Sequence, residues 1–474
     1  MSRGEGEPSS VLVIGGGIAG LAAAIRLAER GIRVTVLETR RKLGGRATSF
    51  KDVRSERVLD NCQHVVLGCC TNYLDFLQRL GAAESIRWHD EQYWIEQGGR
   101  VSIIRPGPLP TPAHFGISML CARLLTLREC SLLGRCCAAI LRVDRDLWDD
   151  RTFGDFLRAH GQTERVINRF WAPVVVSACN VEVDRVSAAA ALHVFQEGFL
   201  ANRHAARMGV PSVPLVDLYA RAESLIEAGG GRVLLGTGVE RLDARSAMTT
   251  CGERFEADAV ICAVPVERVN RIVDPQEQHA DARFAPLDRF THSPILGVHL
   301  EFDRNVMGAM PHCVLVERPT QWLFRKNDEG TYIHAVISAA DSWIALDEDE
   351  IARGVLADIH ACLPATQGAT LVRVRAVKEK LATFAPTPGT ASLRPAATGS
   401  SGIVLAGDYT DTGWPATMEG SARSGYCAAA AVLGLKPSEL LIASLPVARL
   451  SAALGLQSGG NSEKQSKQRA GARP

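Results

Sequence analysis

A glycine-rich turn near the N-terminus constrains the fold of this chain more than any other feature. The apolar run 11–14 leads into the turn 15–20, whose sequence is GGGIAG, and the alanine-rich segment 21–30 follows. A second apolar run occupies 34–37. A strand, a glycine turn, a helix and a second strand in this order predict a βαβ unit that begins a doubly wound α/β domain.

The spacing of the glycines indicates a bound dinucleotide. Gly15 permits the tight turn, Gly17 lets the backbone approach a diphosphate, and Gly20 permits close packing of helix on strand. The helix N-terminus then directs its unpaired N–H groups and its positive dipole end at the phosphates. Glu38 ends the second strand about 20 residues further on, where an acid binds the ribose hydroxyls.

A second glycine pair narrows the dinucleotide to FAD. Arg40 and the triplet Gly44-Gly45-Arg46 follow Glu38 directly. The glycine pair lets another loop approach the cofactor, and Arg46 can neutralise diphosphate charge. A domain that binds NAD needs no such element, so the sequence favours FAD.

Composition excludes several other classes of protein. The net charge of +1 gives no electrostatic basis for binding nucleic acid. The 13 cysteines form no C-x-x-C pair, so we expect no metal site and reduced thiols in a cytoplasmic protein. No run reaches the roughly 18 apolar residues that a membrane span needs, and the N-terminus lacks a signal-peptide core.

The chain of 474 residues is too long for one ordinary core, and we predict two interleaved domains. The strand-like runs within 232–264 and the run just before Gly407-Asp408 look like returns to the first domain. The FAD-binding domain is predicted to comprise 9–105, 205–270 and 385–436. The substrate domain is predicted to comprise 106–204 and 271–384, and the polar segment 457–474 is predicted to be a disordered tail.

These motifs resemble the flavin amine oxidase and phytoene desaturase superfamily. The resemblance rests on Glu-x-Arg followed by Gly-Gly-Arg, on Gly407-Asp408 after a strand, and on the segment from Met418 to Ala422. It implies a Rossmann-like FAD-binding domain of the amine oxidase/glutathione-reductase-2 type, interleaved with an α+β substrate domain. It also implies that Asp408 binds the ribityl chain, that the Met418 N–H meets the flavin pyrimidine, and that the Val239 backbone holds the adenine.

Within the superfamily, two segments resemble the hydroxysqualene dehydroxylase branch. They are Asp60-Asn61-Cys62-Gln63-His64 and the block 407–420, although Cys62 replaces a usual glycine and Lys380 a usual arginine. The resemblance implies reductive dehydroxylation of hydroxysqualene to squalene in hopanoid biosynthesis. Non-covalent FAD would supply the hydride, the substrate would be an isoprenoid, and the electron donor to FAD is not identified by the sequence.

A hydroxyl is a poor leaving group and needs a proton donor. His64 and Asp60 are the candidates, because their loop resembles one that lies near the flavin in the family. The alternatives are a structural role for His64 and a turn or cap role for Asp60. The predicted cofactor-binding residues are Gly15, Gly17, Ile18, Ala19, Gly20, Glu38, Arg40, Gly44, Gly45, Arg46, Gln63, Val239, Gly407, Asp408 and Met418.

The stretch 113–142 mixes apolar residues with arginines, which predicts one or two amphipathic helices. Related desaturases contact membranes at this position, so we expect either peripheral contact with the inner face of the cytoplasmic membrane or ordinary core-facing helices with a solvated arginine face.

Two other functions stay open for a chain of this kind. One is a carotenoid-type desaturase or isomerase. The other is a prenyl-binding carrier similar to the GDP-dissociation inhibitors, which share the fold without a working flavin. Glu38, Arg46 and Asp408 together argue against the carrier.

Overall fold

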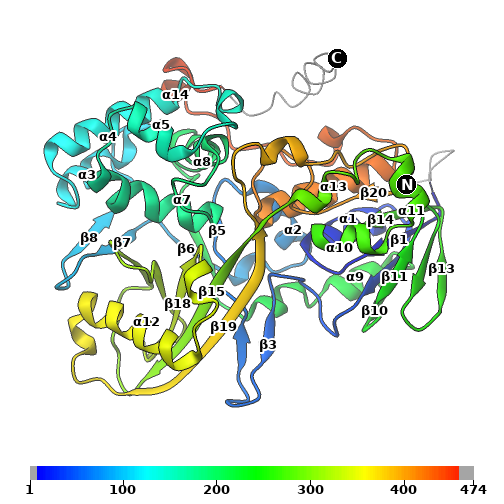
Figure 1. Ribbon diagram of the computed structural model, residues 1–474, viewed down its shortest axis with the longest axis horizontal. Helices are drawn as coiled ribbons and strands as arrows, with labels where there is room; N and C mark the ends of the chain where they lie inside the picture. Colours follow the sequence, from blue (N-terminus) through cyan, green and yellow to red (C-terminus); the bar gives the residue numbers. More distant parts are fainter. Residues whose placement is uncertain (1–7, 458–474) are drawn as a thin grey trace.

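The computed structural model describes residues 8–457 and arranges them around two large β-sheets (Figure 1). The first is a parallel sheet with the strand order β10-β2-β1-β14-β20. Its strands are β1 (Ser10–Ile14), β2 (Arg33–Glu38), β10 (Arg232–Leu235), β14 (Ala259–Cys262) and β20 (Val404–Leu405). The chain therefore leaves this sheet after β2 and returns to it three times, at β10, β14 and β20, in the doubly wound arrangement that the glycine turn predicts.

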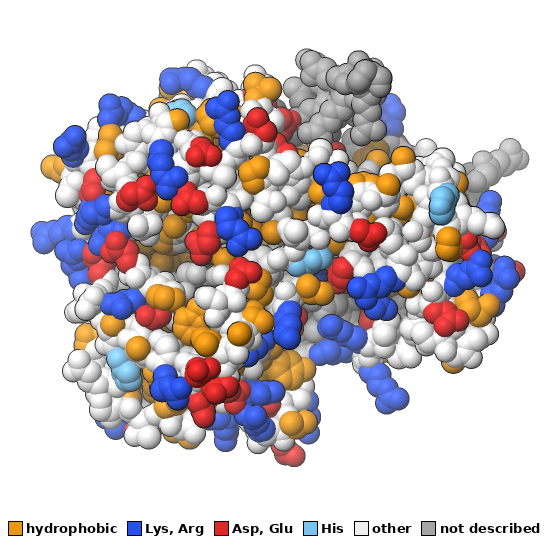
Figure 2. Space-filling view, in the orientation of Figure 1, with side chains coloured by type: hydrophobic (Ala, Val, Ile, Leu, Met, Phe, Trp, Pro, Cys, Tyr) orange, Lys and Arg blue, Asp and Glu red, His pale blue; other side chains and the backbone are white. Residues whose placement is uncertain are grey.

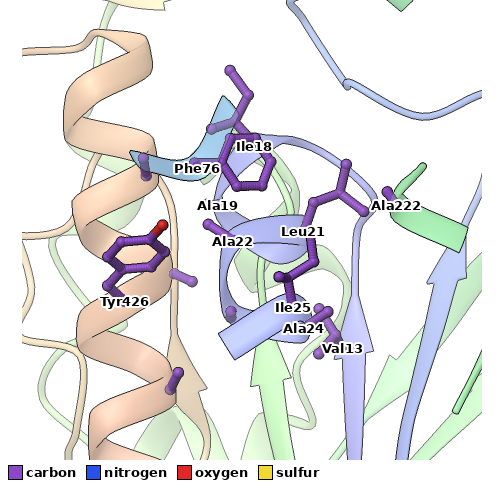
Figure 3. Close-up of a cluster of buried hydrophobic side chains, with 14 of the residues drawn as sticks. Val13, Ile18, Ala19, Leu21, Ala22, Ala24, Ile25, Phe76, Ala222 and Tyr426 are labelled. Atoms are coloured by element: carbon purple, nitrogen blue, oxygen red, sulfur yellow. The ribbon is translucent and has the colours of Figure 1, made fainter. Parts of the chain in front are cut away.

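Strand β1 is apolar from Val11 to Ile14 because both faces of its sheet are covered. Val11 and Val13 pack with helix α1 (Ile18–Ala28), whereas Leu12 packs on the other face with helix α10 (Val266–Ile272). Figure 3 shows Tyr426 and Phe76 directed at the side chains of α1. They come from helices α13 (Met418–Val432) and α2 (Thr71–Arg79).

Small residues let α1 and α13 approach closely. A Cβ placed on Gly425 of α13 would lie 2.3 Å from the Ala19 carbonyl oxygen and 2.8 Å from the Ala22 Cβ. No side chain fits in that space, which explains the alanine-rich composition of α1 and the glycine in the middle of α13.

The second sheet has the strand order β19-β15-β18-β17-β16-β7-β8. Its strands are β19 (Leu371–Phe384), β15 (His292–Phe302), β18 (Tyr332–Ser338), β17 (Trp322–Arg325), β16 (His312–Leu315), β7 (Gln92–Ile95) and β8 (Val101–Ile104). Alternate residues of β15 and β18 pack on helix α12 (Glu348–Cys362). The intervening positions, among them His299 and His334, therefore face the opposite side, where the chain segment 60–64 lies.

Strands β7 and β8 correct one predicted domain boundary. We expected 92–105 to lie in the FAD-binding domain. In the structure β7 pairs in parallel with β16, with Trp94 opposite Val314, and β8 pairs with β7. The partner strand lies more than 200 residues later in the chain, and nothing in the alternating pattern of 92–104 identifies a partner so distant.

A helical lobe stands beside the second sheet (Figure 1). The stretch 113–142, predicted to form one or two helices, contains α3 (Gly116–Cys121) and α4 (Leu127–Ile140). The rest of the lobe comprises α5 (Phe153–Ala159), α6 (Glu164–Val166), a π-helical turn (Ile167–Trp171), α7 (Ala172–Cys179), α8 (Ala188–Phe195) and a second π-helical turn (Gln196–Leu200). Buried aromatic rings form part of its core, and the ring centroids of Trp171 and Phe195 lie 4.7 Å apart.

Smaller elements complete the described part of the chain. They are β3 (Ser49–Lys51), β4 (Val58–Asp60), β5 (Val66–Leu67), β6 (Ile86–His89), β9 (Met208–Pro211), β11 (Val239–Leu242), β12 (Ser246–Thr249), β13 (Arg254–Glu256), α9 (Ala222–Ala228), α11 (Pro275–Ala280) and α14 (Arg449–Ala453). Within 8–457, no helix combines the length and apolar character required to cross a bilayer. The predicted disordered tail, 457–474, lies outside the described residues except for its first residue.

Two helical glycines test the close packing of α1 on α13. We expect Gly425→Ala to lower the free energy of unfolding by about 1–3 kcal/mol, because the added methyl group has no space. Gly134→Ala in α4 is the matched control. It points into open space and should stabilise the protein by about 0.5–1 kcal/mol. Urea unfolding of both variants measures the difference, and equal stabilities would contradict the packing argument.

Candidate active site

Two glycine loops touch at the carboxyl-terminal edge of the parallel sheet, where ligands bind in doubly wound folds. The Gly44 N–H donates to the Gly16 carbonyl at 2.9 Å. A Cβ on Gly45 would lie 3.0 Å from the Gly17 Cα. Side chains at these positions would therefore fill the cradle that the two loops form.

The start of α1 fits an anionic group. A Cβ on Gly20 would lie 2.0 Å from the Gly15 carbonyl oxygen, so the first turn packs against the end of β1 as only glycine allows. Gly17 precedes the helix without a capping side chain, and the first turn carries no acidic residue. The N–H groups of Ile18 and Ala19 are thus available to a diphosphate.

Glu38, Arg40 and Val239 meet at the end of β2. The buried Glu38 carboxylate accepts hydrogen bonds from the Gly16 and Arg40 N–H groups, both at 2.7 Å. The Thr237 N–H donates to the Glu38 carbonyl at 2.9 Å, which brings the start of β11 and Val239 to the same edge. The structure therefore gathers the residues predicted to hold the adenosine part of the cofactor.

Arg46 and Asp408 form an ion pair of 2.6 Å. Burial opposes the Arg46 charge, but the Asp408 carboxylate outweighs this effect and raises the pKa of the guanidinium. Arg46 also donates to the Ala382 carbonyl of β19 at 3.1 Å. One side chain thus joins the second glycine loop, the end of β20 and the second sheet.

Glu419 fixes the N-terminus of α13, the helix that begins at Met418. Its carboxylate is 1% exposed and accepts from the Asn72 and Tyr73 N–H groups at the start of α2, at 3.2 and 2.7 Å. It also pairs with Arg423 at 2.6 Å, and the Arg423 guanidinium lies over the Trp414 ring. The position of Met418 therefore depends on a buried charge pair.

The loop 60–64 lies between the glycine loop 44–46 and the second sheet. The Asn61 side-chain amide donates to the Arg46 carbonyl at 2.5 Å. The Asp60 carboxylate accepts from the Ser49 hydroxyl at 2.7 Å and from the Lys326 ammonium at 3.0 Å. Lys326 also donates to the Gln63 amide oxygen at 2.9 Å, so the Gln63 side chain helps to hold this loop.

Asp60 is poorly suited to donate a proton. Burial alone would raise the pKa of this carboxyl, but the Lys326 charge and the hydrogen-bond donors outweigh burial and lower it below its ordinary value. The carboxylate is therefore ionised at neutral pH and occupied by its partners.

His64 is better suited than Asp60 to exchange a proton with a ligand. Its Nδ1 lies 3.1 Å from the Cys62 carbonyl oxygen, which assigns the proton of the neutral ring to Nδ1. The structure gives its Nε2 no hydrogen-bond partner within residues 8–457. Burial lowers the pKa of His64. The ring thus offers one free nitrogen that can accept a hydrogen bond when neutral or donate a proton when charged.

Sequence motifs missed a group of buried polar residues behind this loop. The His299 Nε2 donates to the Asp60 carbonyl at 2.9 Å, and its Nδ1 accepts from the Tyr332 hydroxyl at 2.7 Å. His334 stacks on His299 with ring centroids 3.9 Å apart. These residues lie more than 200 positions after Asp60, and the available signal was only a polar residue at alternate positions of two apolar runs, 295–302 and 332–338.

An apolar wall borders the same loop. Cys62, Phe324 and Val336 are buried there, and Val65, Ile295 and Trp322 are partly exposed beside them. Apolar side chains next to one free imidazole nitrogen suit a substrate that is largely hydrocarbon with a single polar group. Among residues 8–457, no group of three or more His, Cys, Asp or Glu side chains is arranged to hold a metal ion.

The buried pair at the start of α13 can be tested directly. Glu419→Gln keeps the shape of the side chain but leaves Arg423 without a countercharge, so we expect a loss of about 3–5 kcal/mol in unfolding free energy. Glu256→Gln removes an exposed carboxylate that pairs with Arg254 and should change stability by less than about 0.5 kcal/mol. Similar urea midpoints for the two variants would show that the pair does not anchor α13.

The chain is similar in sequence to known enzymes over most of its length. The chain is 29% identical over 447 residues to a hydroxysqualene dehydroxylase of Rhodopseudomonas palustris, with 90% of this chain and 98% of the relative covered. It is 26% identical to a probable zeta-carotene desaturase of Synechococcus elongatus, with 89% and 98% covered.

Solved structures share the fold at lower identity. A putrescine oxidase variant superposes with a TM-score of 0.68 at 18% identity, covering 90% of this chain and 99% of that one. Cyclohexylamine oxidase from Brevibacterium oxydans gives 0.66 at 18% identity, covering 90% and 99%. The model of the family described as flavin containing amine oxidoreductase matches residues 18–433. The chain therefore belongs to this family and is an FAD-dependent oxidoreductase.

Proposed function

We propose that this protein reductively dehydroxylates hydroxysqualene to squalene in hopanoid biosynthesis. The observation that carries the proposal is the loop 60–64, which is tied to Arg46 on one side and to Lys326 on the other, beside an apolar wall. The hydroxysqualene dehydroxylase relatives support the same assignment. Hydroxysqualene, the anionic form of reduced FAD and one proton would give squalene, water and oxidised FAD.

The residues around the glycine loops would hold the cofactor. Reduced FAD, when bound, supplies the hydride. Gly15 to Gly20 and Arg46 would face its diphosphate, Glu38 and Val239 its adenosine, and Asp408 its ribityl chain. Binding would be non-covalent, because Cys427 lies inside α13. The donor that reduces the flavin is a separate partner that this chain does not identify.

His64 would interact with the hydroxyl that leaves the substrate. Its free Nε2 can accept a hydrogen bond from the substrate hydroxyl or, when charged, donate the proton that leaves with it as water. Asp60 would act as a positioning residue, because it is ionised and holds the loop through Ser49 and Lys326. The apolar wall would orient the hydrocarbon and exclude water.

The pH dependence follows from the lowered pKa of His64. A proton donor acts in its charged form, which predominates below its pKa, so kcat/KM should be highest in acid and fall as pH rises through a value below about 6.5. Loss of a general acid costs about 10²–10⁴-fold, and we expect His64→Gln to lose rate by that factor and to flatten the pH profile. An unchanged profile in the variant would remove His64 from this role.

Carotenoid-type desaturation is the second candidate, because the relatives include carotene and phytoene desaturases. A polyene offers no polar group to the free His64 nitrogen, which favours the hydroxylated substrate. The carrier hypothesis has no comparable support, since Glu38, Arg46 and Asp408 are assembled around the glycine loops.

Product analysis separates the two enzymatic functions. Holoprotein reduced under anaerobic conditions should convert hydroxysqualene to squalene, with one flavin oxidised for each squalene formed. Oxidised holoprotein supplied with phytoene and a quinone should leave the phytoene unchanged. Extension of the conjugated system in the second reaction, together with no squalene in the first, would assign the protein as a desaturase.

We also propose peripheral contact between this protein and a membrane. Exposed aliphatic side chains gather on β8, α3 and the segment joining them, with Ile103 40%, Leu109 38%, Ile117 42% and Leu120 53% exposed. We call these four residues the apolar patch. Figure 2 shows Lys and Arg side chains gathered along the edge where α3 and α4 lie in Figure 1. An apolar patch beside basic side chains suits the interface of a bilayer, where an isoprenoid substrate would reside.

A further inference from the structure

A cleft of about 660 Å³ opens beside the helical lobe, away from the glycine loops. Its walls come from the turn between β6 and β7, from the end of β8, and from the chain just before β9. The residues that matter for its chemistry are Trp88, Arg105, Arg203, His204 and Arg207.

The cleft carries an excess of positive charge. Arg207 pairs with Asp90 at 2.9 Å, and Arg105 pairs with Glu91 at 2.8 Å. Arg203 donates to the Gly107 carbonyl at 2.9 Å, and the ion pairs found within residues 8–457 give it no carboxylate. Two of the three arginines are thus neutralised, and Arg203 keeps its charge for a ligand.

Two imidazoles lie next to Arg203. His204 is exposed in the cleft wall. His114 lies behind the wall, and burial together with the charges of Arg203 and His204 lowers its pKa to about 4.

The cleft borders the apolar patch. Arg105 lies between Ile103 and Leu109 on the same stretch of chain. A Cβ on Gly107, whose carbonyl accepts from Arg203, would lie 4.0 Å from Ile117. Trp88 adds an amphipathic ring with Arg207 stacked over it at 5.3 Å. A positive cleft and an exposed apolar surface thus share an edge.

We propose that the cleft binds the phosphate headgroup of an anionic phospholipid while the apolar patch contacts the acyl chains of the same leaflet. The volume exceeds that of a bare phosphate and lies within the range of about 300–1,000 Å³ typical of small-molecule sites. Arg203 would meet the phosphate, and Trp88 would lie at the level of the headgroups. This inference rests on the membrane contact proposed above.

Flotation of the holoprotein with vesicles tests the headgroup site. Vesicles of phosphatidylcholine with about one third phosphatidylglycerol should bind more protein than phosphatidylcholine alone. Arg203→Gln should weaken binding to the anionic vesicles about fivefold, the effect of one basic residue near such a surface. Raising the salt from low to about 1 M should abolish the increment.

A control substitution at an arginine outside the cleft distinguishes binding at the cleft from attraction to the overall charge of the protein. Arg271 is exposed on α10, away from the cleft, and Arg271→Gln should leave anionic binding unchanged. Equal losses in the two variants, or equal binding of the wild type to both kinds of vesicle, would overturn the proposal. So would calorimetric binding of glycerol 3-phosphate by the free protein combined with vesicle binding that ignores Arg203→Gln, because the ligand would then be a soluble phosphate.

Two further measurements distinguish this inference from the proposals on which it rests. Ile117→Ser/Leu120→Ser should reduce binding even to neutral vesicles, and retained binding would refute the apolar patch and the headgroup site that adjoins it. Dehydroxylation in detergent micelles should be the same for Arg203→Gln and wild type. A loss of activity in micelles would overturn the headgroup assignment in favour of a role in substrate turnover.

Discussion

The ion pair between Arg46 and Asp408 joins parts of the chain that are 362 residues apart. Asp408 follows the last strand of the parallel sheet, and Arg46 belongs to the glycine loop that closes over the start of α1. Asp408 is buried, so loss of Arg46 would leave its carboxylate without this countercharge. Because Arg46 also binds the carbonyl of Ala382, the same contact sets the second sheet against the first.

The position of the loop 60–64 depends on the contacts of Arg46 and on the second sheet. Asn61 binds the backbone of Arg46, while Asp60 and Gln63 bind Lys326 beyond the end of β17. A shift of one sheet against the other would therefore move His64 relative to the cofactor loops. Asp60 and Lys326 hold this loop, and the proposed function gives the proton transfer to the His64 imidazole.

Local patterns were enough to predict the cofactor unit. Each part of this unit is explained by the geometry of a few neighbouring residues. The parts are the glycine turn, Glu38 and the Gly44-Gly45-Arg46 triplet, and the structure places them together. The placement of β7 and β8 and the roles of Lys326, His299 and His334 depend on pairings between distant strands. A single sequence carries no signal for such pairings, so these residues became visible only with the tertiary structure. Asp60 illustrates the same limit, because its distant partner Lys326 is among the groups that lower the pKa of its carboxyl.

Anaerobic single turnover in D₂O tests the central claim most directly. The flavin N–H exchanges with solvent, so reduced holoprotein in D₂O would carry deuterium at the position that delivers the hydride. The account predicts squalene with one deuterium on carbon and one flavin oxidised per squalene. Unchanged hydroxysqualene with the flavin still reduced, or squalene without deuterium, would contradict it.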